Sequence, residues 1–498
     1  MRITNKMMTN NMLSNINKNK LNMTKLEQQY TSGKKIQRPS DDPIVTVRAL
    51  KLRTNVSELK QYYEKNIPDA MSWMDVTESA LKTINEILRE MNTYCIQGSS
   101  DTLTASDRSS IVQNLKQMKE QIYQEGNTNY AGRYVFTGFK TDSSLVFQED
   151  TKNLTYSIKE NFTGKDLGVI EKVKGDYSLE DLDDPDLDLS VLPKKENSYR
   201  LQLSYDNLDV EDMESIQYFK RTADGELLEQ PPFTNINRVS VSDENAYWPM
   251  DNEINFIPET GELIFGKDAY EEFRTAEKIT IDYNKSNFLK GDLKPEHYFD
   301  CVVTDTLKPE LEPIEYKKEG KQEIQYEINY NQKLTINTEG SEAISHKIGR
   351  EIDDIINSVE MVENTEKMIA KVKERLQDTN LSPEDREGYE RMLEQLDIQL
   401  TYGKDIMQKA FSRGISLTHQ EQDRVNVAVA DLGSRYVRLE LTENRLSSQM
   451  VDFKELMSKN EDADVVETFI KFTAAQSIYN ASLSAASRVV QSTLLDFL

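Results

Sequence analysis

The stretch VTVRALKLRTNVSELKQYYEKNIPDAMSWMDVTESALKTINEILREMNTY, residues 45–94, decides the fold. Apolar and aromatic residues recur in it at alternating spacings of four and three, which is the pattern of a coiled-coil seam. The rhythm lasts for seven heptads, so the stretch predicts one long helix. Pro68 lies inside it and lacks the backbone N–H that the helix needs, so we expect a kink or a short break there.

A second helix is predicted directly after the first. The polar stretch GSSDTLTASD, residues 98–107, contains a glycine that ends a helix and Thr104, which is followed three residues later by Asp107. A hydroxyl residue in that relation to an acid is typical of a helix N-cap. The expected helix carries its apolar stripe through Ile111 and Ile122 and ends at Gly126.

The same seam returns at both ends of the chain. It runs from Leu432 to Met457, is broken by SKNEDAD at residues 458–464, and restarts at Val465. A shorter version occupies residues 12–30. We predict that these terminal seams form an assembly interface, with the residues Met12, Ile16, Met23, Leu26, Tyr30, Val465, Phe469, Phe472, Tyr479, Leu483, Val490 and Phe497.

The terminal seams need partners. Burying one large apolar side chain stabilises a protein by roughly 1.5 to 3 kcal/mol, so an isolated terminal helix would leave a costly stripe in water. We expect the two ends to pair as an antiparallel coiled coil whose remaining apolar surface binds neighbouring subunits. Because short helices are marginal alone, we also expect the first 40 and last 45 residues or so to order only on assembly. The alternative is that the seams pack on the chain's own core.

The middle of the chain follows a different pattern. SYRLQLSY (198–205), KITIDY (278–283) and EIQYEINY (323–330) alternate apolar and polar residues, as half-buried strands do. INFIPETGELIF (254–265) predicts a hairpin. The acidic run LEDLDDPDLDL (179–189) is interpreted as a solvated loop; calcium binding is the alternative, although the spacing of an EF-hand loop is absent.

Helical spacing resumes after Gly340, and Ser382 with Pro383 predicts the start of a further helix, so we expect a helical hairpin here. The predicted fold is therefore mainly α at the two ends, with long antiparallel coiled-coil helices, a β-rich central insertion and an extra helical hairpin. The expected division is a terminal coiled-coil domain (1–43 and 458–498), a helical rod domain (44–140 and 413–457), an acidic outer domain (141–340) and the hairpin (341–412).

Charge excludes some classes of partner. The chain of 498 residues has a formal net charge of -25, which argues against nucleic acid and anionic membranes as main partners. Residues 141–340 hold 44 acidic and 22 basic residues, a balance of -22, whereas the first 60 residues hold 12 bases and 4 acids. The acidic charge thus belongs to the predicted outer domain.

Chemistry-bearing residues are sparse. Cys95 and Cys301 are far apart and lack metal-type spacing, so each is expected to be a buried thiol. His297, His346 and His419 are predicted in the β-rich block, at a helix start and in a loop, with solvated or structural roles. Zinc-protease, phosphate-loop, nucleophile-elbow and dinucleotide motifs are absent, so we predict neither an enzyme nor a cofactor or metal site.

Targeting signals are equally sparse. The sequence has no run of 18 apolar residues, and MRITNKMMTNNML lacks the apolar core and cleavage site of a secretory signal. We therefore predict no membrane insertion and, if the protein leaves the cell, a route without a cleaved signal peptide.

The stretch RPSDDP, residues 38–43, is interpreted as a joint between two helical segments. Arg38 precedes Pro39 and is biased toward extended geometry. Ser40 is expected to cap a helix that begins at Asp41, with Asp41 and Asp42 favoured by the helix dipole and Pro43 tolerated in the first turn.

Five pieces of the sequence together carry a family resemblance. They are TSGKKIQRPSDDP (31–43), the heptad helix, NTNYAGRYVFTG (127–138), ADLGSRYVRLE (430–440) and SRVVQSTLLDFL (487–498), in this order. On them the chain resembles the flagellin superfamily and, within it, the hook-associated junction proteins. Flagellins tend to have an alanine-rich continuation at the position of RPSDDP and to lack the GRYxF segment. The resemblance covers about the first 140 and last 85 residues.

This resemblance implies an extracellular structural protein at the junction of hook and filament. It implies a tubular homo-oligomer at the distal end of the hook, with the hook-side junction protein and flagellin or the filament cap as neighbours. It also implies export through the flagellar type III apparatus and an export chaperone that shields the C-terminal seam. In that tube the termini would line the inside and residues 141–412 would project outward. The alternatives are a filament-forming flagellin and a filament-displayed enzyme or adhesin.

Overall fold

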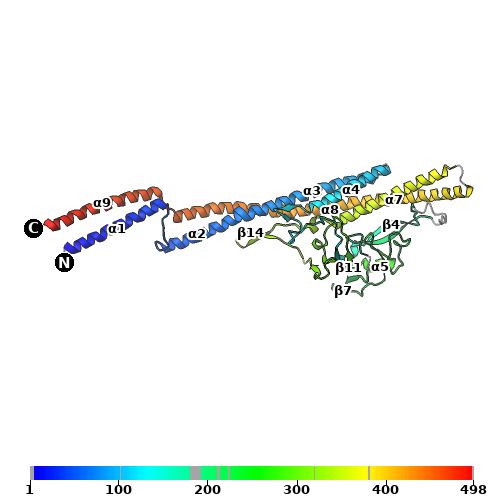
Figure 1. Cartoon of the computed structure of the whole chain (residues 1–498), viewed down its shortest axis with the longest axis horizontal. Helices are drawn as coiled ribbons and strands as arrows, with labels where there is room; N and C mark the ends of the chain where they lie inside the picture. Colours follow the sequence, from blue (N-terminus) through cyan, green and yellow to red (C-terminus); the bar gives the residue numbers. More distant parts are fainter. Residues whose placement is uncertain are drawn as a thin grey trace. The chain divides into compact units, whose positions relative to one another are not determined.

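The structure is a computed structural model that describes residues 5–100, 103–179, 192–209, 213–222, 225–318, 320–378 and 382–495. Helices form both ends of the chain and strands form the middle (Figure 1), as the sequence predicts. The chain divides into two compact units. The terminal unit contains residues 1–70, 326–334 and 437–498, and the central unit contains residues 71–325 and 335–436.

The terminal unit pairs the first and last helices. Helix α1 (Asn5–Ser32) and helix α9 (Val465–Leu495) lie side by side, blue and red in Figure 1. The side-chain amide of Asn19 donates a hydrogen bond to the hydroxyl of Ser482 at 3.0 Å. The rings of Tyr30 and Phe469 lie 5.4 Å apart. Because the earlier residue of α1 contacts the later residue of α9, the pair is antiparallel, and the predicted pairing of the two ends is confirmed.

The long N-terminal helix does not break at Pro68. Helix α2 (Pro43–Gln61) continues through a π-helical turn (Tyr62–Asn66) into α3 (Ile67–Gly98). In the wide turn the N–H of Ile67 donates to the carbonyl of Tyr62, five residues earlier. The expected kink or short break is therefore replaced by a π-turn, because one extra residue in the turn accommodates a proline whose N–H is missing.

Four helices build the helical part of the central unit: the rest of α3, α4 (Ala105–Glu125), α7 (His346–Leu376) and most of α8 (Pro383–Glu461). Thr104 and Asp107 form the predicted capping box of α4. The hydroxyl of Ser382 accepts from the N–H of Asp385 at 3.0 Å and so caps α8, as predicted. Trp73, Met74, Leu81, Ile84, Leu88 and Met91 of α3 are fully buried.

The long helix α8 bears on the predicted loop at His419 and on the predicted domain boundary after residue 412. His419 lies inside this helix and its side chain is exposed, so the expected loop there is wrong. No proline follows Pro383 in the helix, and Gly414 and Gly433 lie within it without breaking it. The expected boundary after residue 412 also falls within α8, so that part of the domain division stays a prediction. The predicted break at residues 458–464 is present but shorter, since α8 continues to Glu461 and α9 begins at Val465.

The β-rich block contains two sheets that share one core. The five-stranded sheet has the order β4–β5–β10–β9–β8, and the six-stranded sheet has the order β13–β12–β3–β11–β6–β7. Leu201 and Leu263 from the first sheet and Ile158 and Ile281 from the second lie in one buried cluster. The strands are β3 (Leu154–Phe162), β4 (Gly168–Lys174), β5 (Lys194–Gln202), β6 (Gln217–Arg221), β7 (Leu227–Glu229), β8 (Ile236–Arg238), β9 (Ile254–Ile257), β10 (Glu262–Phe265), β11 (Lys278–Lys285), β12 (Asp300–Asp305) and β13 (Ile314–Tyr316).

The strands predicted from the alternating pattern are present. β5, β11 and the hairpin of β9 and β10 lie where the sequence places them. The third alternating stretch forms β14 (Gln325–Asn329), which pairs with β15 (Gln332–Thr335), a strand that was not predicted. Helices α5 (Lys267–Phe273) and α6 (Gly340–Ala343) are short. The acidic run at residues 179–189 lies, apart from Leu179, outside the described residues, so its solvated-loop and calcium interpretations stay predictions.

A tyrosine ties the β-rich block to the helical hairpin of α7 and α8. Tyr177 follows β4 and packs among Met368, Val372 and Leu396. The side-chain amide of Gln399 accepts from the N–H of Tyr177 at 2.9 Å and donates to its carbonyl at 3.1 Å. Because Gln399 satisfies both backbone groups, as a neighbouring strand would, this segment can be buried without cost in unpaired polar groups.

The segment NTNYAGRYVFTG forms a small hairpin that packs on α3. Strands β1 (Asn129–Tyr130) and β2 (Arg133–Tyr134) are joined through Ala131 and Gly132, which have φ values of 51° and 81°. Positive φ at both positions is typical of the tight two-residue hairpin turn and favours the glycine. The guanidinium of Arg133 lies 5.0 Å from the centre of the Trp73 ring, and the Tyr130 ring lies 6.1 Å from it.

Both cysteines are free, buried thiols, as the sequence predicts. Burial raises the pKa of each thiol to about 12, so both are protonated at neutral pH. Within the described part of the chain, no helix is both long enough and apolar enough to cross a bilayer.

Candidate assembly surface

The predicted seams of α1 and α9 mostly face the groove between these two helices. Ile16 is buried, and the other seam residues of α1 except Tyr30 are half-buried. Phe472 and Tyr479 of α9 are half-buried, while Val465, Phe469 and Leu483 lie at the exposed edge. Val490 lies in α9 but its side chain is outside the described residues, as is Phe497. Whether these seam residues also contact other subunits stays a prediction.

Six further exposed apolar residues, which the sequence did not predict as interface residues, lie on the sides of α1 and α9 that point away from their seams. On α9 they are Val466, Ile470 and Ile478, which are 70%, 62% and 56% exposed. On α1 they are Met7, Leu13 and Leu21. We call these six residues the outer apolar face. Helix α9 is apolar around most of its circumference. A helix that buries only one face is polar on the other, so the apolar residues on both sides of α9 could have indicated a second contact surface from the sequence.

The joint between α1 and α2 is a paired structure. The N–H of Lys35 donates to the carbonyl of Glu461 at 2.7 Å, and the N–H of Ala463 donates to the carbonyl of Gly33 at 2.8 Å. The segment after α1 thus lies antiparallel to the segment between α8 and α9. Both connections are thus tied together, at the point where α1 ends and α9 begins.

Ion pairs around Glu461 reinforce the joint. Its carboxylate accepts two hydrogen bonds from the guanidinium of Arg53, at 2.7 and 2.6 Å, and lies 3.4 Å from the ammonium of Lys34. Its side chain is only 6% exposed. The hydrogen bonds from Arg53 outweigh burial and lower the pKa of Glu461. Asp462 takes a further hydrogen bond from Lys34 at 2.5 Å, which lowers the pKa of its carboxyl as well.

Asp42, and not Ser40, caps helix α2. The carboxylate of Asp42 accepts from the N–H groups of Ile44 and Val45, each at 3.1 Å, and the helix begins at Pro43. The expectation that Ser40 caps a helix starting at Asp41 is therefore wrong. Asp41 instead accepts from the N–H groups of Gln37 and Arg38, and the bond from Arg38 is the main reason that the pKa of Asp41 is lowered. Two adjacent acids thus close two different turns, and helix-start patterns alone do not separate them.

Replacing Asp42 by alanine should destabilise the terminal unit by about 1 kcal/mol, because two N–H groups at the start of α2 lose their acceptor. Replacing Ser40 by alanine should change the stability by much less than that. Urea unfolding followed by helical circular dichroism measures both. Equal losses for the two variants would contradict the capping geometry.

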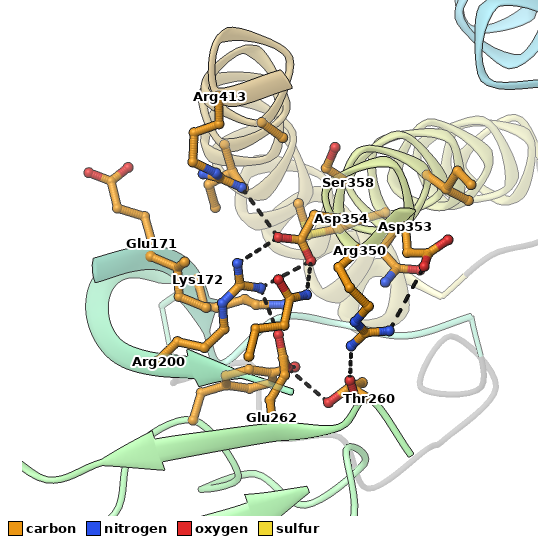
Figure 2. A pocket seen from close by; sticks show the side chains of 18 of the residues that line it. Glu171, Lys172, Arg200, Thr260, Glu262, Arg350, Asp353, Asp354, Ser358 and Arg413 are labelled. Atoms are coloured by element: carbon orange, nitrogen blue, oxygen red, sulfur yellow. Dashed lines mark hydrogen bonds and ion pairs between the residues drawn. The ribbon is translucent and has the colours of Figure 1, made fainter. Parts of the chain in front are cut away.

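The central unit contains a charged cavity of about 410 Å³ between the five-stranded sheet and helices α7 and α8 (Figure 2). Arg200 of β5 donates to Glu262 of β10 at 2.7 Å and to Asp354 of α7 at 2.6 and 3.0 Å. Burial disfavours ionisation of both carboxyls, but Arg200 outweighs it and lowers their pKa values. Arg350 of α7 donates to the carbonyl of Thr260 in the β9–β10 turn. These ion pairs bind the sheet to the helix.

The two buried histidines have structural partners. His297 Nε2 lies 3.1 Å from the carbonyl oxygen of Ser144, and His346 Nε2 lies 2.9 Å from the hydroxyl of Tyr205. Burial is the main reason that the pKa of each is lowered to about 3. Across the described residues, no group of three histidine, cysteine, aspartate or glutamate side chains could hold a metal ion.

The histidines should make the central unit less stable in mild acid. A folded-state pKa near 3 lies below the unfolded value near 6.5, so the unfolded chain binds protons first and stability falls as the pH drops from 6.5 toward 3. Each histidine contributes a slope of about 1.4 kcal/mol per pH unit. Glu296 and Asp353, whose pKa values burial raises, act in the opposite direction.

Comparison with a His346→Phe variant separates these contributions. Its free energy of unfolding, measured in urea at pH 7 and pH 5, should depend less steeply on pH by about 1.4 kcal/mol per unit below pH 6.5. Phenylalanine fits the aromatic surroundings of Tyr205, Tyr298 and Phe299. An unchanged slope would show that His346 is already protonated in the folded chain.

Both ends of the chain match known protein families. Residues 3–141 match the bacterial flagellin N-terminal helical region, and residues 415–498 match the bacterial flagellin C-terminal helical region. The terminal helices, the joint and the Arg133 hairpin all lie within these two matches.

Individual relatives match over one part of the chain. A flagellar hook-associated protein 3 from Salmonella typhimurium is 29% identical over 145 residues, which are 29% of this chain and 45% of that protein. A flagellar hook-associated protein 3 from Escherichia coli is 27% identical over 153 residues, 30% of this chain and 48% of that protein. A flagellin from Clostridium tyrobutyricum is 33% identical over 142 residues, 28% of this chain and 35% of that protein. The chain thus spans about half or less of the length of these relatives.

A solved structure described as a putative flagellar hook-associated protein from Vibrio parahaemolyticus aligns with 85% of this chain and all of its own, at 12% identity. The TM-score is 0.37, which is too low to establish a shared overall fold.

Proposed function

Because the chain carries the helical regions of bacterial flagellins at its two ends, we propose that it is a structural subunit of the bacterial flagellum. It polymerises as a tube at the distal end of the hook and connects the hook to the flagellin filament, where motility requires it. The observation that carries this proposal is the antiparallel pair of terminal helices with an apolar face left open to solvent.

The physical argument starts from the outer apolar face. Leaving its large side chains in water costs roughly 1.5 to 3 kcal/mol each compared with burial, so the face favours association. Because the two ends of the chain pair, the α1–α9 pair carries these exposed apolar residues. The α1–α9 pair of a neighbouring copy then covers them. Repetition of this contact gives a polymer and requires no catalytic residue.

The junction role is preferred to a filament role because of two local features. The joint stretch TSGKKIQRPSDDP lacks the alanine-rich continuation of flagellins, and the GRYVF segment forms a hairpin on Trp73. The hook-associated relatives and the flagellin relative align over stretches of similar length, so the length of the match does not separate the two roles. A filament-forming flagellin remains the second candidate, since that relative is the more identical one over the matched residues.

The proposal includes partners and a location. The partners are other copies of this chain, the hook-side junction protein, and flagellin or the filament cap. We further propose export through the flagellar type III apparatus without a cleaved signal, with a chaperone that covers the C-terminal helix until assembly. The division into terminal, rod, outer and hairpin segments given above is part of the same proposal.

Immunolabelling of intact flagella tests the role. A label against residues 141–340 should mark a narrow zone where hook meets filament. Label along the whole filament would favour the flagellin alternative. Deletion of the gene provides an independent check, because hooks should persist on the cells while flagellin accumulates in the medium.

Limited proteolysis of the purified monomer tests the ordering of the ends. If the terminal helices form stably only in the polymer, protease should remove segments at both ends before it cuts the central unit. Ends that resist protease as long as the centre would contradict ordering on assembly, and would favour the alternative that the seams pack stably within the monomer.

A further inference from the structure

A small cavity of about 180 Å³ opens at the joint of the terminal unit. Its apolar wall contains Ile36 and Pro39 from the joint and Leu50 from α2. Three cationic side chains also line it, Lys34, Arg38 and Arg53. Its one acidic lining residue among the described residues, Glu461, is paired with Lys34 and Arg53. An apolar wall combined with cations fits a side chain that has an apolar stem and an anionic tip.

The cations of this cavity differ in their partners. Arg53 and Lys34 share the carboxylate of Glu461, and Lys34 also binds Asp462. The backbone N–H of Arg38 donates to Asp41, and the charge of Arg38 is one of the smaller causes that lower the pKa of that carboxyl. Among the described residues, no side chain makes a hydrogen bond or ion pair with its guanidinium. The guanidinium offers a planar pair of donors that matches a carboxylate. Arg38 is thus the cation of the cavity that remains available.

The surface beside the cavity is apolar and open. Ile44, Val47 and Leu50 follow one another on α2 at spacings of three, so they form a short stripe, and they are 75%, 54% and 56% exposed. Leu50 belongs to both the stripe and the cavity wall. Whatever covers the stripe therefore also reaches the cavity.

We infer that this cavity receives an aspartate or glutamate side chain from a second copy of the chain, with its carboxylate paired to Arg38. Charge complementarity supports a second copy as the occupant. The first 60 residues carry 12 bases and 4 acids, while the whole chain has a net charge of -25, so a neighbouring copy offers acidic side chains to a basic patch. The inference rests on the proposed polymeric function and specifies one of its contacts.

An Arg38→Lys variant allows the contact to be trapped. Lysine keeps the positive charge and, unlike arginine, supplies an amine that a carbodiimide joins to a carboxylate only within ion-pair distance. Flagella purified from cells that carry this variant should give a new cross-linked dimer of the chain. Mass spectrometry should find residue 38 joined to an acidic residue of another copy.

The matched control is Arg48→Lys, which places the same amine on an exposed part of α2 that does not line the cavity. It should add no dimer beyond that of the unmodified chain, whose Lys34 and Lys35 give the background. An Arg38→Ala variant should lower incorporation into flagella at least about tenfold. Its monomer should unfold at the same urea concentration as the unmodified chain.

Three results would overturn the inference. The first is a link from residue 38 to Asp41 of the same chain alone. The second is a link to a different protein, and the third is no new link although immunolabelling shows the variant in place. Absence of the unmodified chain from flagella would instead refute the proposed function, so the two failures are distinguishable.

Discussion

Replacing Arg200 by alanine is expected to destabilise the central unit by about 3 to 5 kcal/mol. Arg200 is the shared partner of Glu262 and Asp354, and the three side chains are 10%, 5% and 13% exposed. Without the guanidinium, Glu262 loses its ion-pair partner and Asp354 keeps only the more distant Arg413, at 3.7 Å, although both carboxylates are largely buried. Urea unfolding at pH 7 measures the loss.

The matched control removes all three charges together, as Arg200→Met with Glu262→Leu and Asp354→Leu. Replacing a buried ion cluster by apolar residues of similar size is often neutral or stabilising, so this variant should lose far less than Arg200→Ala. Acid should also partly rescue Arg200→Ala. Once Arg200 is gone, burial acts with less opposition and raises the pKa values of Glu262 and Asp354, so protonation restores stability as the pH falls. A loss below 1 kcal/mol at pH 7 would mean that water already shields the carboxylates.

The double substitution Val466→Asp with Ile470→Asp is expected to abolish incorporation into the flagellum. Burying two large apolar side chains in a subunit contact contributes about 3 to 6 kcal/mol, so their loss weakens each contact more than a hundredfold. Helix α9 itself should remain intact. Asp464 already caps it by accepting from Val466 and Glu467, and acidic residues near a helix N-terminus are favoured by the helix dipole.

The control adds the same two charges with the same spacing at polar, exposed positions of α9, as Gln476→Asp with Asn480→Asp. It should incorporate nearly normally. Quantifying the chain in purified flagella by immunoblot compares the two variants, and helical circular dichroism of the monomers checks that both fold. Equal incorporation would exclude the outer apolar face from the assembly contact.

Local sequence rules predicted the helices and their caps well. Thr104 with Asp107 and Ser382 with Pro383 start helices where the sequence places them, because an N-cap depends on groups only a few residues apart. The heptad spacing of residues 45–94 likewise predicted the buried face of α3, including Trp73 and Ile84. The buried face depends on the helical period, which can be read from the spacing of apolar residues.

The sequence did not decide which of several neighbouring residues caps a helix or how a helix accommodates a proline. Ser40 and Asp42 are both good N-caps, and the structure uses Asp42 because Asp41 is occupied by the turn at Gln37 and Arg38. Pro68 forbids a regular helix, but the sequence does not distinguish a break from a π-turn, since both remove the same hydrogen bond. His419 lies among polar residues, and exposed helical positions are polar too, so polarity does not separate a loop from a helix there.

The sequence by itself determined that two helical ends pair and that a β-rich insertion separates them, because periodicity, turns and caps are encoded in short stretches of chain. Only the tertiary structure decided which apolar residues of α9 face α1 and which face solvent, since a helix that is apolar on nearly all sides has no unique inward face. The tertiary structure alone also brought Arg53, Lys34 and Glu461 together. It placed Arg38 at a cavity, where its guanidinium has no hydrogen-bond partner among the described residues. Such groupings join residues hundreds of positions apart, and no local pattern records them.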